Sequence, residues 1–156
     1  MDDDPSQRIE VTWQSNLVPI PTERVRETVE AVLRAEGCQR AELSVAIVDD
    51  AEMAGLHERH LGVAGPTDVL SFDLGVANAS PGCGIDGEVV VSAETAARTA
   101  QGLGTETEPE VLLYIIHGVL HLLGYEDKAV EPATRMRARE DEILAALGCA
   151  APVRST

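Results

Sequence analysis

Residues 105–128 read TETEPEVLLYIIHGVLHLLGYEDK. This stretch predicts the element around which the rest of the chain folds. Nearly every residue from Val111 to Leu123 is apolar. A helix that is apolar on all sides belongs in the middle of a domain. Gly124 predicts where the helix ends, because glycine readily adopts the left-handed conformation that closes a helix. We therefore expect a buried central helix followed by a tight turn.

Two histidines interrupt this apolar run. His117 and His121 are four residues apart, so on a helix they project from one face, one turn apart. Asp127 follows at the position where zinc proteases with the motif H-E-x-x-H-x-x-G-x-x-H place their third ligand, and Gly118 takes the place of the glutamate. The spacing predicts a metal site of His117, His121 and Asp127 with an open position for water, which is typical of catalytic sites. The competing interpretation is a pair of hydrogen-bonded core histidines.

Length and composition predict one globular domain. The chain has 156 residues, of which 44% are hydrophobic, and no apolar run is long enough to cross a membrane. The first residues, MDDDPSQ, are unlike a secretory signal, and the three widely spaced cysteines suit reduced thiols, so we expect a cytoplasmic protein. We predict a disordered segment at 1–7, a domain at 8–148 and a frayed tail at 149–156.

The net charge of −15 bears on possible partners. It argues against a broad electrostatic hold on nucleic acid, because phosphate contacts need basic side chains. All basic residues except Lys128 are arginine, the side chain best shaped to bind phosphate. A local basic groove on an acidic protein therefore stays compatible with the sequence.

The remaining patterns predict an α+β fold, a small mixed four-stranded sheet packed with about five helices, with the metal-binding helix central. Strands are expected at 8–13, 43–48, 69–72 and 87–91, and the last two are expected to form an antiparallel pair. Helices are expected at 22–36, 51–61, 92–103, 107–123 and 133–147. We expect helix caps at Thr22 and Ser92 and a capping box of Thr107 and Glu110, while the loop 76–86 is long enough for a functional flap.

Several motifs resemble one known family. HGVLHLLGYED, at 117–127, resembles the H-G-x-L-H-L-x-G-Y-D-H signature of the bacterial YbeY-type endoribonucleases. GPTDVLSF at 65–72 is similar to that family's P-T-D-V-L-S-F segment, and GEVVVS at 87–92 to its G-D-I-x-I-S strand. The closing pattern M-x-x-x-E-x-x-I-L-x-x-L-G fits 136–148. The resemblance covers most of the chain from Leu43 onward.

The resemblance implies a metal-dependent hydrolase of the bacterial cytoplasm that usually holds zinc. It implies an endonuclease acting on single-stranded rRNA, in maturation of the 16S 3′ end and in ribosome quality control. The expected partners are rRNA and the small ribosomal subunit with its proteins, and neither DNA nor a membrane. His117 and His121 correspond to metal ligands, and Asp127 stands where the family has a third histidine. Zinc is the expected ion, one per chain, with another divalent transition metal as the alternative.

The chain departs from the family at a second position. Many members carry an arginine shortly before the P-T-D-V segment, and Leu61 aligns with it. Arg59 is a candidate substitute with a possible catalytic role, and His57 is another. His57 and His60 could also form a second metal pair, although no carboxylate follows them at ligand spacing.

Gly118 bears on the reaction, because a peptidase of this motif would need a glutamate base there. The expected chemistry is metal-assisted hydrolysis of a phosphodiester, with either water or an RNA 2′-hydroxyl as the nucleophile. Ser71 and Thr67 could bind phosphate or merely complete a turn. Two other functions remain open. One is a ribosome-assembly or binding factor with a structural metal, and the other is a metallohydrolase acting on a small molecule or peptide.

Overall fold

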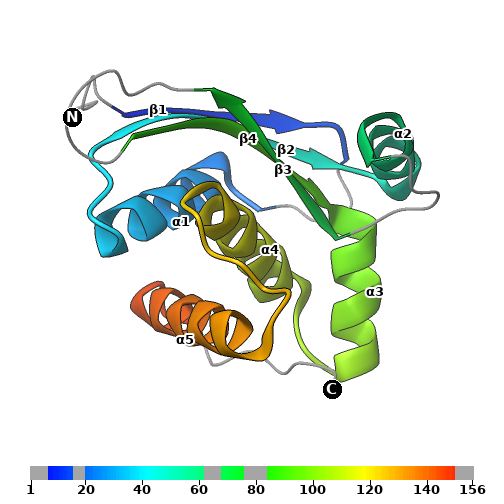
Figure 1. Ribbon diagram of the computed structural model, residues 1–156. Coiled ribbons are helices and arrows are strands. Elements are labelled where there is room, and N and C mark those ends of the chain that lie inside the picture. Colours follow the sequence, from blue (N-terminus) through cyan, green and yellow to red (C-terminus); the bar gives the residue numbers. More distant parts are fainter. Residues whose placement is uncertain (1–6, 16–19, 62–67, 76–83, 150–156) are drawn as a thin grey trace.

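Nine helices and strands make up the part of the chain that the computed structural model describes, which is residues 7–15, 20–61, 68–75 and 84–149 (Figure 1). In chain order they are β1 (Gln7–Trp13), α1 (Thr22–Ala35), β2 (Arg40–Val48), α2 (Asp50–Leu61), β3 (Val69–Gly75), β4 (Gly84–Ser92), α3 (Ala93–Leu103), α4 (Thr107–Leu122) and α5 (Val130–Ala146). The predicted order of elements is confirmed. The domain limits stay a prediction, although Gln7 is already part of β1.

The sheet has the strand order β1-β2-β4-β3. β1, β2 and β4 run parallel, and β3 runs antiparallel to β4. Parallel neighbours need a crossover connection, which α1 supplies between β1 and β2. The predicted α+β fold with a mixed four-stranded sheet and five helices is confirmed.

Helices pack on both faces of the sheet, and α2 covers only one end of its face (Figure 1). Val45 and Ile47 of β2 face the main core with α1 and α4, while Ala46 and Val48 face a smaller core that contains Met53 of α2. This alternation follows from the pleat of a strand, which points successive side chains to opposite faces. In Figure 1, α1 and α4 lie under the sheet and α5 forms a further layer beneath them.

Helix α4 is the centre of the main core, as the sequence predicts. It contacts α1, α3, α5, β3 and β4 (Figure 1). Its apolar side chains are fully buried at Leu112, Ile115, Ile116, Val119 and Leu120. Other elements bury most of its surface, and its histidine face is partly exposed. No described helix is long and apolar enough to cross a membrane.

Gly118 lets α4 lie directly against β3 and β4. A Cβ at this position would lie 2.6 Å from Cγ1 of Val89, 3.0 Å from Cγ2 of Val69 and 3.1 Å from Oγ of Ser71. The Ser71 hydroxyl donates a hydrogen bond to the Gly118 carbonyl at 2.8 Å. There is no room here for any side chain, which explains why the glutamate of the zinc-protease motif is missing.

Two of the predicted helix caps are wrong. The N-cap of α1 is Pro21, and the Thr22 hydroxyl instead accepts a hydrogen bond from Nε1 of Trp13 at 3.2 Å. The N-cap of α4 is Glu106, which makes no side-chain cap hydrogen bond, so Thr107 is the first helical residue and not the cap. The Ser92 cap is confirmed, since its hydroxyl accepts from the Thr95 amide at 3.1 Å.

Several limits of the elements also differ from the prediction. α5 begins at Val130, upstream of the predicted 133, because Pro132 falls in the first turn, where a missing N–H costs nothing. β4 begins at Gly84, so it takes in the end of the predicted 76–86 loop. The rest of that loop, 76–83, lies outside the described residues, and with it the expected flap.

The close approach at Gly118 gives a stability prediction. Gly118→Ala is expected to lower the free energy of unfolding by about 1–3 kcal/mol, because the added methyl group overpacks the contact with β4. Gly102→Ala is a matched control, since Gly102 lies in α3 and a Cβ added there would have nothing within 4 Å. It should raise stability by up to about 1 kcal/mol through helix propensity. Urea denaturation of both variants measures the difference, and a stabilised Gly118→Ala would contradict the packing argument.

Candidate metal centre

The site is built where α4 ends and the chain reverses. Gly124, at φ +103°, follows the last helical turn. Its N–H donates to the His121 carbonyl at 3.0 Å, and the Tyr125 N–H donates to the Leu120 carbonyl at 3.0 Å. These two bonds form a Schellman motif, which satisfies carbonyls that the helix end leaves open. The turn brings Asp127 back to the histidine face of α4.

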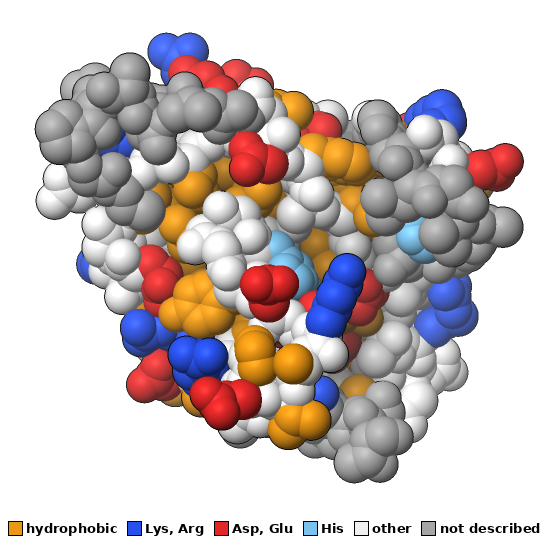
Figure 2. All heavy atoms as spheres, viewed as in Figure 1, with side chains coloured by type: hydrophobic (Ala, Val, Ile, Leu, Met, Phe, Trp, Pro, Cys, Tyr) orange, Lys and Arg blue, Asp and Glu red, His pale blue; other side chains and the backbone are white. Residues whose placement is uncertain are grey.

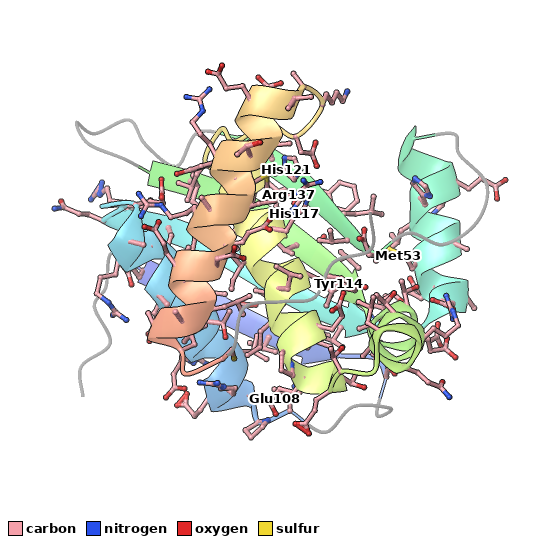
Figure 3. All side chains as sticks on the ribbon, turned by 90° about the horizontal axis from the view of Figure 1, so that it is seen from below. Met53, Glu108, Tyr114, His117, His121 and Arg137 are labelled. Atoms are coloured by element: carbon pink, nitrogen blue, oxygen red, sulfur yellow. The ribbon has the colours of Figure 1, made fainter. Side chains whose placement is uncertain are left out.

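Three side-chain atoms converge in front of this face. Nε2 of His117 and Nε2 of His121 are 3.0 Å apart. Oδ2 of Asp127 lies 3.3 Å from each of them. Figure 3 shows both histidines projecting from the same side of α4. All three side chains are partly exposed, so an ion or a ligand could reach this point.

The other ring nitrogen of each histidine has its own partner. Nδ1 of His117 lies 2.6 Å from Oε2 of Glu140, whose side chain is 3% exposed. Nδ1 of His121 lies 3.0 Å from the Tyr125 carbonyl oxygen. A carboxylate and a carbonyl accept hydrogen bonds, so each Nδ1 carries a hydrogen. Each neutral imidazole therefore presents its Nε2 lone pair to the other histidine and to Asp127.

Three electron-rich atoms that face one another call for a cation between them. Ligand atoms about 2.0–2.1 Å from a tetrahedral zinc ion lie about 3.3 Å from one another. The observed separations of 3.0, 3.3 and 3.3 Å match that geometry. Partners on the second ring nitrogen are also usual for metal-binding histidines. The group His117, His121 and Asp127 could therefore hold a metal ion.

Protonation of His117 opposes metal binding. Burial lowers the pKa of His117, but the hydrogen bond and charge of Glu140 and the charges of Asp127 and Asp68 outweigh burial, so the pKa is raised above its ordinary value. A proton and a metal ion compete for the same Nε2 lone pair. The acidic surroundings that attract a cation therefore also hold a proton more firmly.

The three atoms open into a groove of about 560 Å³ between α4 and β3. Figure 2 shows histidine side chains sunk in the middle of this face with charged side chains around them. The described residues that line the groove include three carboxylates and one ammonium group: Asp68, Asp73, Asp127 and Lys128. The described lining is thus acidic, and it does not form the local basic groove that the arginine content had left open.

The other predicted residues lie elsewhere. Arg59 is on α2 and does not line the groove. Its guanidinium lies 4.0 Å from Glu52, and its side chain is 63% exposed. His57 is on the same helix, whereas the side chains of His60 and Leu61 lie outside the described residues. The catalytic role of Arg59 therefore stays a prediction.

Three other residues considered in the sequence also have no established role in the site. Glu126 is exposed and does not belong to the group that could hold a metal. Ser71 lines the groove, but its hydroxyl hydrogen is committed to Gly118. Thr67 lies outside the described residues.

Sequence reasoning missed the two groups that orient the histidines. Glu140 lies on the buried stripe of α5 with Met136, Ile143 and Leu144. A carboxylate on an apolar stripe requires a buried partner, and this signal could have identified Glu140 as functional. Tyr125 acts through its backbone carbonyl, which leaves no signal in the sequence.

Comparisons with known proteins agree on one family. Residues 10–148 match the sequence profile of the family described as Endoribonuclease YbeY. Endoribonuclease YbeY of Chloroherpeton thalassium is 37% identical over 128 residues, covering 82% of this chain and 87% of that protein. The protein of the same name from Pelotomaculum thermopropionicum is 41% identical over 124 residues, covering 76% and 80%.

A solved structure shares the fold. The solution structure of TM1509 from Thermotoga maritima superposes with a TM-score of 0.61 over 94% of this chain and 99% of that one. The sequence identity is 24%, so this similarity bears on the fold alone.

The geometry predicts which acid after the helix binds metal. Asp127→Ala should reduce zinc affinity by more than the about 10–100-fold that loss of a supporting partner costs, because it removes a ligand atom. Glu126→Ala should leave the affinity within about twofold, because that side chain is exposed and outside the group. Titration with zinc against a competing chelator measures both. A larger loss in Glu126→Ala would place the ligand one residue earlier.

The raised pKa of His117 predicts how metal affinity depends on pH. Zinc needs the unprotonated Nε2, so apparent affinity should fall as the pH drops through this pKa. Since the shift is upward, the fall should begin above the about 6.5 of an ordinary histidine. Chelator competition at a series of pH values tests this. An affinity that stays constant from about pH 8 to about pH 6 would contradict it.

Proposed function

The chain belongs to the YbeY endoribonuclease family, and from this we propose that it is a metal-dependent endoribonuclease specific for single-stranded RNA. The observation that carries the metal dependence is the convergence of two histidine lone pairs and a carboxylate oxygen on one point. We propose zinc as the ion, since two imidazoles and one carboxylate are a common zinc donor set.

Each side chain in the centre has a defined task in this proposal. His117, His121 and Asp127 hold the ion through Nε2, Nε2 and Oδ2. Glu140 and the Tyr125 carbonyl keep the histidine hydrogens on Nδ1, so that both lone pairs stay directed at the ion. A bound zinc ion would supply Lewis acidity, lowering the pKa of a water to about 7 and polarising a phosphoryl oxygen.

The surroundings of Gly118 favour a phosphodiester over a peptide substrate. Zinc peptidases of the related motif use a glutamate at this position as the general base. Here Val89, Val69 and Ser71 fill the space that such a side chain would need. Hydrolysis of a phosphodiester depends mainly on positioning and on neutralising charge, which a bound metal ion could provide without that base.

The acidic groove makes the cation important for binding as well as for catalysis. Without a cation, the carboxylates of Asp68, Asp73 and Asp127 outnumber the one described ammonium group, Lys128, and repel an RNA phosphate. The positive charge of a divalent ion would offset this excess of negative charge. In this proposal RNA enters the groove only when the ion is bound.

We place the activity in the cytoplasm, in maturation of the 16S rRNA 3′ end and in ribosome quality control. The partners would be rRNA and the small ribosomal subunit with its proteins. Support comes from the family to which the chain belongs and from the resemblance of its motifs.

A second candidate is a ribosome-assembly factor whose metal serves structure. The acidic lining of the groove and the net charge of −15 favour it, because they suit basic proteins better than bare RNA. The two candidates differ in whether purified protein cuts RNA.

Cleavage of RNA tests the proposal. Zinc-loaded protein should cut a single-stranded RNA oligonucleotide and should leave a duplex RNA and a DNA of the same sequence intact. His121→Ala should reduce the rate by at least about 100-fold, since it removes a metal ligand. Glu126→Ala is the matched control and should cut at the wild-type rate. Loss of metal without loss of cleavage would refute metal dependence, and RNA binding without cleavage would favour the assembly factor.

The ends of the fragments identify the nucleophile. Attack by water leaves fragments with a hydroxyl and a phosphate monoester, whereas attack by the 2′-hydroxyl leaves a 2′,3′-cyclic phosphate. An RNA with a single 2′-deoxy residue at the cut site separates the two routes, because only the second needs the hydroxyl. Mass spectrometry of the products reads the outcome.

A further inference from the structure

We propose that Tyr125 is a positioning residue for the metal centre, and that its hydroxyl bond to Glu36 holds the segment 125–127 at the distance that metal binding needs. The inference rests on the proposed metal site. It adds a link from the centre to helix α1, which contributes no ligand.

Tyr125 connects the centre to the body of the protein through two atoms. Its backbone carbonyl accepts from Nδ1 of His121 at 3.0 Å, and its hydroxyl donates to Oε2 of Glu36 at 2.9 Å. The ring therefore spans the distance between a ligand and α1. Asp127 is only two residues further on, so a shift of Tyr125 would displace two of the three ligands.

Glu36 is a firm anchor for this hydroxyl. It is the C-cap of α1, its backbone N–H is bonded to the Val32 carbonyl, and its side chain is 15% exposed. Oε2 of Glu36 also lies 2.6 Å from Nε of Arg139, which comes from α5. Arg139 in turn contacts Oε1 of Glu142 at 3.1 Å. The anchor is thus held by residues of both α1 and α5, which pack against α4.

An anchor matters for this segment because a hollow separates part of it from α5. The turn after α4 has neither helix nor strand from 123 to 129. A hollow of about 550 Å³ lies between this turn and α5, and Leu123, Gly124, Tyr125 and Glu126 line it. The Schellman bonds fix the backbone as far as Tyr125. The Tyr125 side chain adds a further restraint, because its hydroxyl donates to Oε2 of Glu36 at 2.9 Å and accepts a longer bond, of 3.5 Å, from Nε of Arg139.

The test uses Tyr125→Phe, which keeps the ring and the carbonyl and removes only the hydroxyl. We expect zinc affinity, measured against a chelator, to fall about 10-fold, and the visible absorption of the cobalt-substituted protein to change as the third ligand moves. Tyr114→Phe is a matched control, because that hydroxyl is bonded to Thr99 and Glu110 in the core. It should lower stability and leave zinc affinity within about twofold.

Variants of Glu36 test the same hydrogen bond from its acceptor side. Glu36→Gln keeps an oxygen that can accept from the hydroxyl, so its affinity should stay close to that of the wild type. Glu36→Ala should lose as much as Tyr125→Phe, and the double variant should lose no more than either single one. Unchanged affinity in Tyr125→Phe, or equal losses in Tyr125→Phe and Tyr114→Phe, would overturn the inference. Since the readout is metal affinity, failure of RNA cleavage alone would refute the proposed function and leave this inference standing.

Discussion

The close approach of α4 to the sheet at Gly118 is the constraint on which the rest of the structure depends. The helix is buried except on its histidine face, and at Gly118 its backbone touches β3 and β4 with no room for a Cβ. The residue before this contact, His117, and the one a turn later, His121, are therefore placed beside β3 and open to the groove. A helix set further from the sheet would move both nitrogens. The packing of α4 against the sheet thus fixes the positions of the two histidine nitrogens that could bind a metal.

Around this helix, the polar groups of the centre are supplied by elements distant in sequence. Glu140 comes from α5, the Tyr125 carbonyl from the turn, and Glu36 from the end of α1. Each satisfies a group that burial would otherwise leave unpaired, which is expensive in a core. The same bonds decide which ring nitrogen of each histidine is free. The hydrogen bonds that satisfy these buried polar groups therefore also orient the histidines for metal binding.

The parts predicted from the sequence were those determined locally. The apolar run of α4 and the spacing of His117, His121 and Asp127 are properties of one helix and its turn, and the structure brings these three residues together. Glu140 was missed because its partner depends on how α5 packs. The predictions that Thr22 and Thr107 cap their helices were wrong, because they considered only the local sequence and not the tertiary contacts of these residues. The distance of Arg59 from the groove could not be foreseen, because α2 packs on the far face of the sheet.

The contribution of α5 to the centre has a consequence for biosynthesis. Chains are made from the N-terminus, and domains fold as they emerge. The two histidines and Asp127 emerge before Glu140, which lies on the last of the described helices. A nascent chain can thus present its ligands while the proton on His117 is still free to occupy either nitrogen. The centre matures only when α5 has been synthesised and packed, so a chain that stalls before this helix carries the metal-binding motif without a finished site.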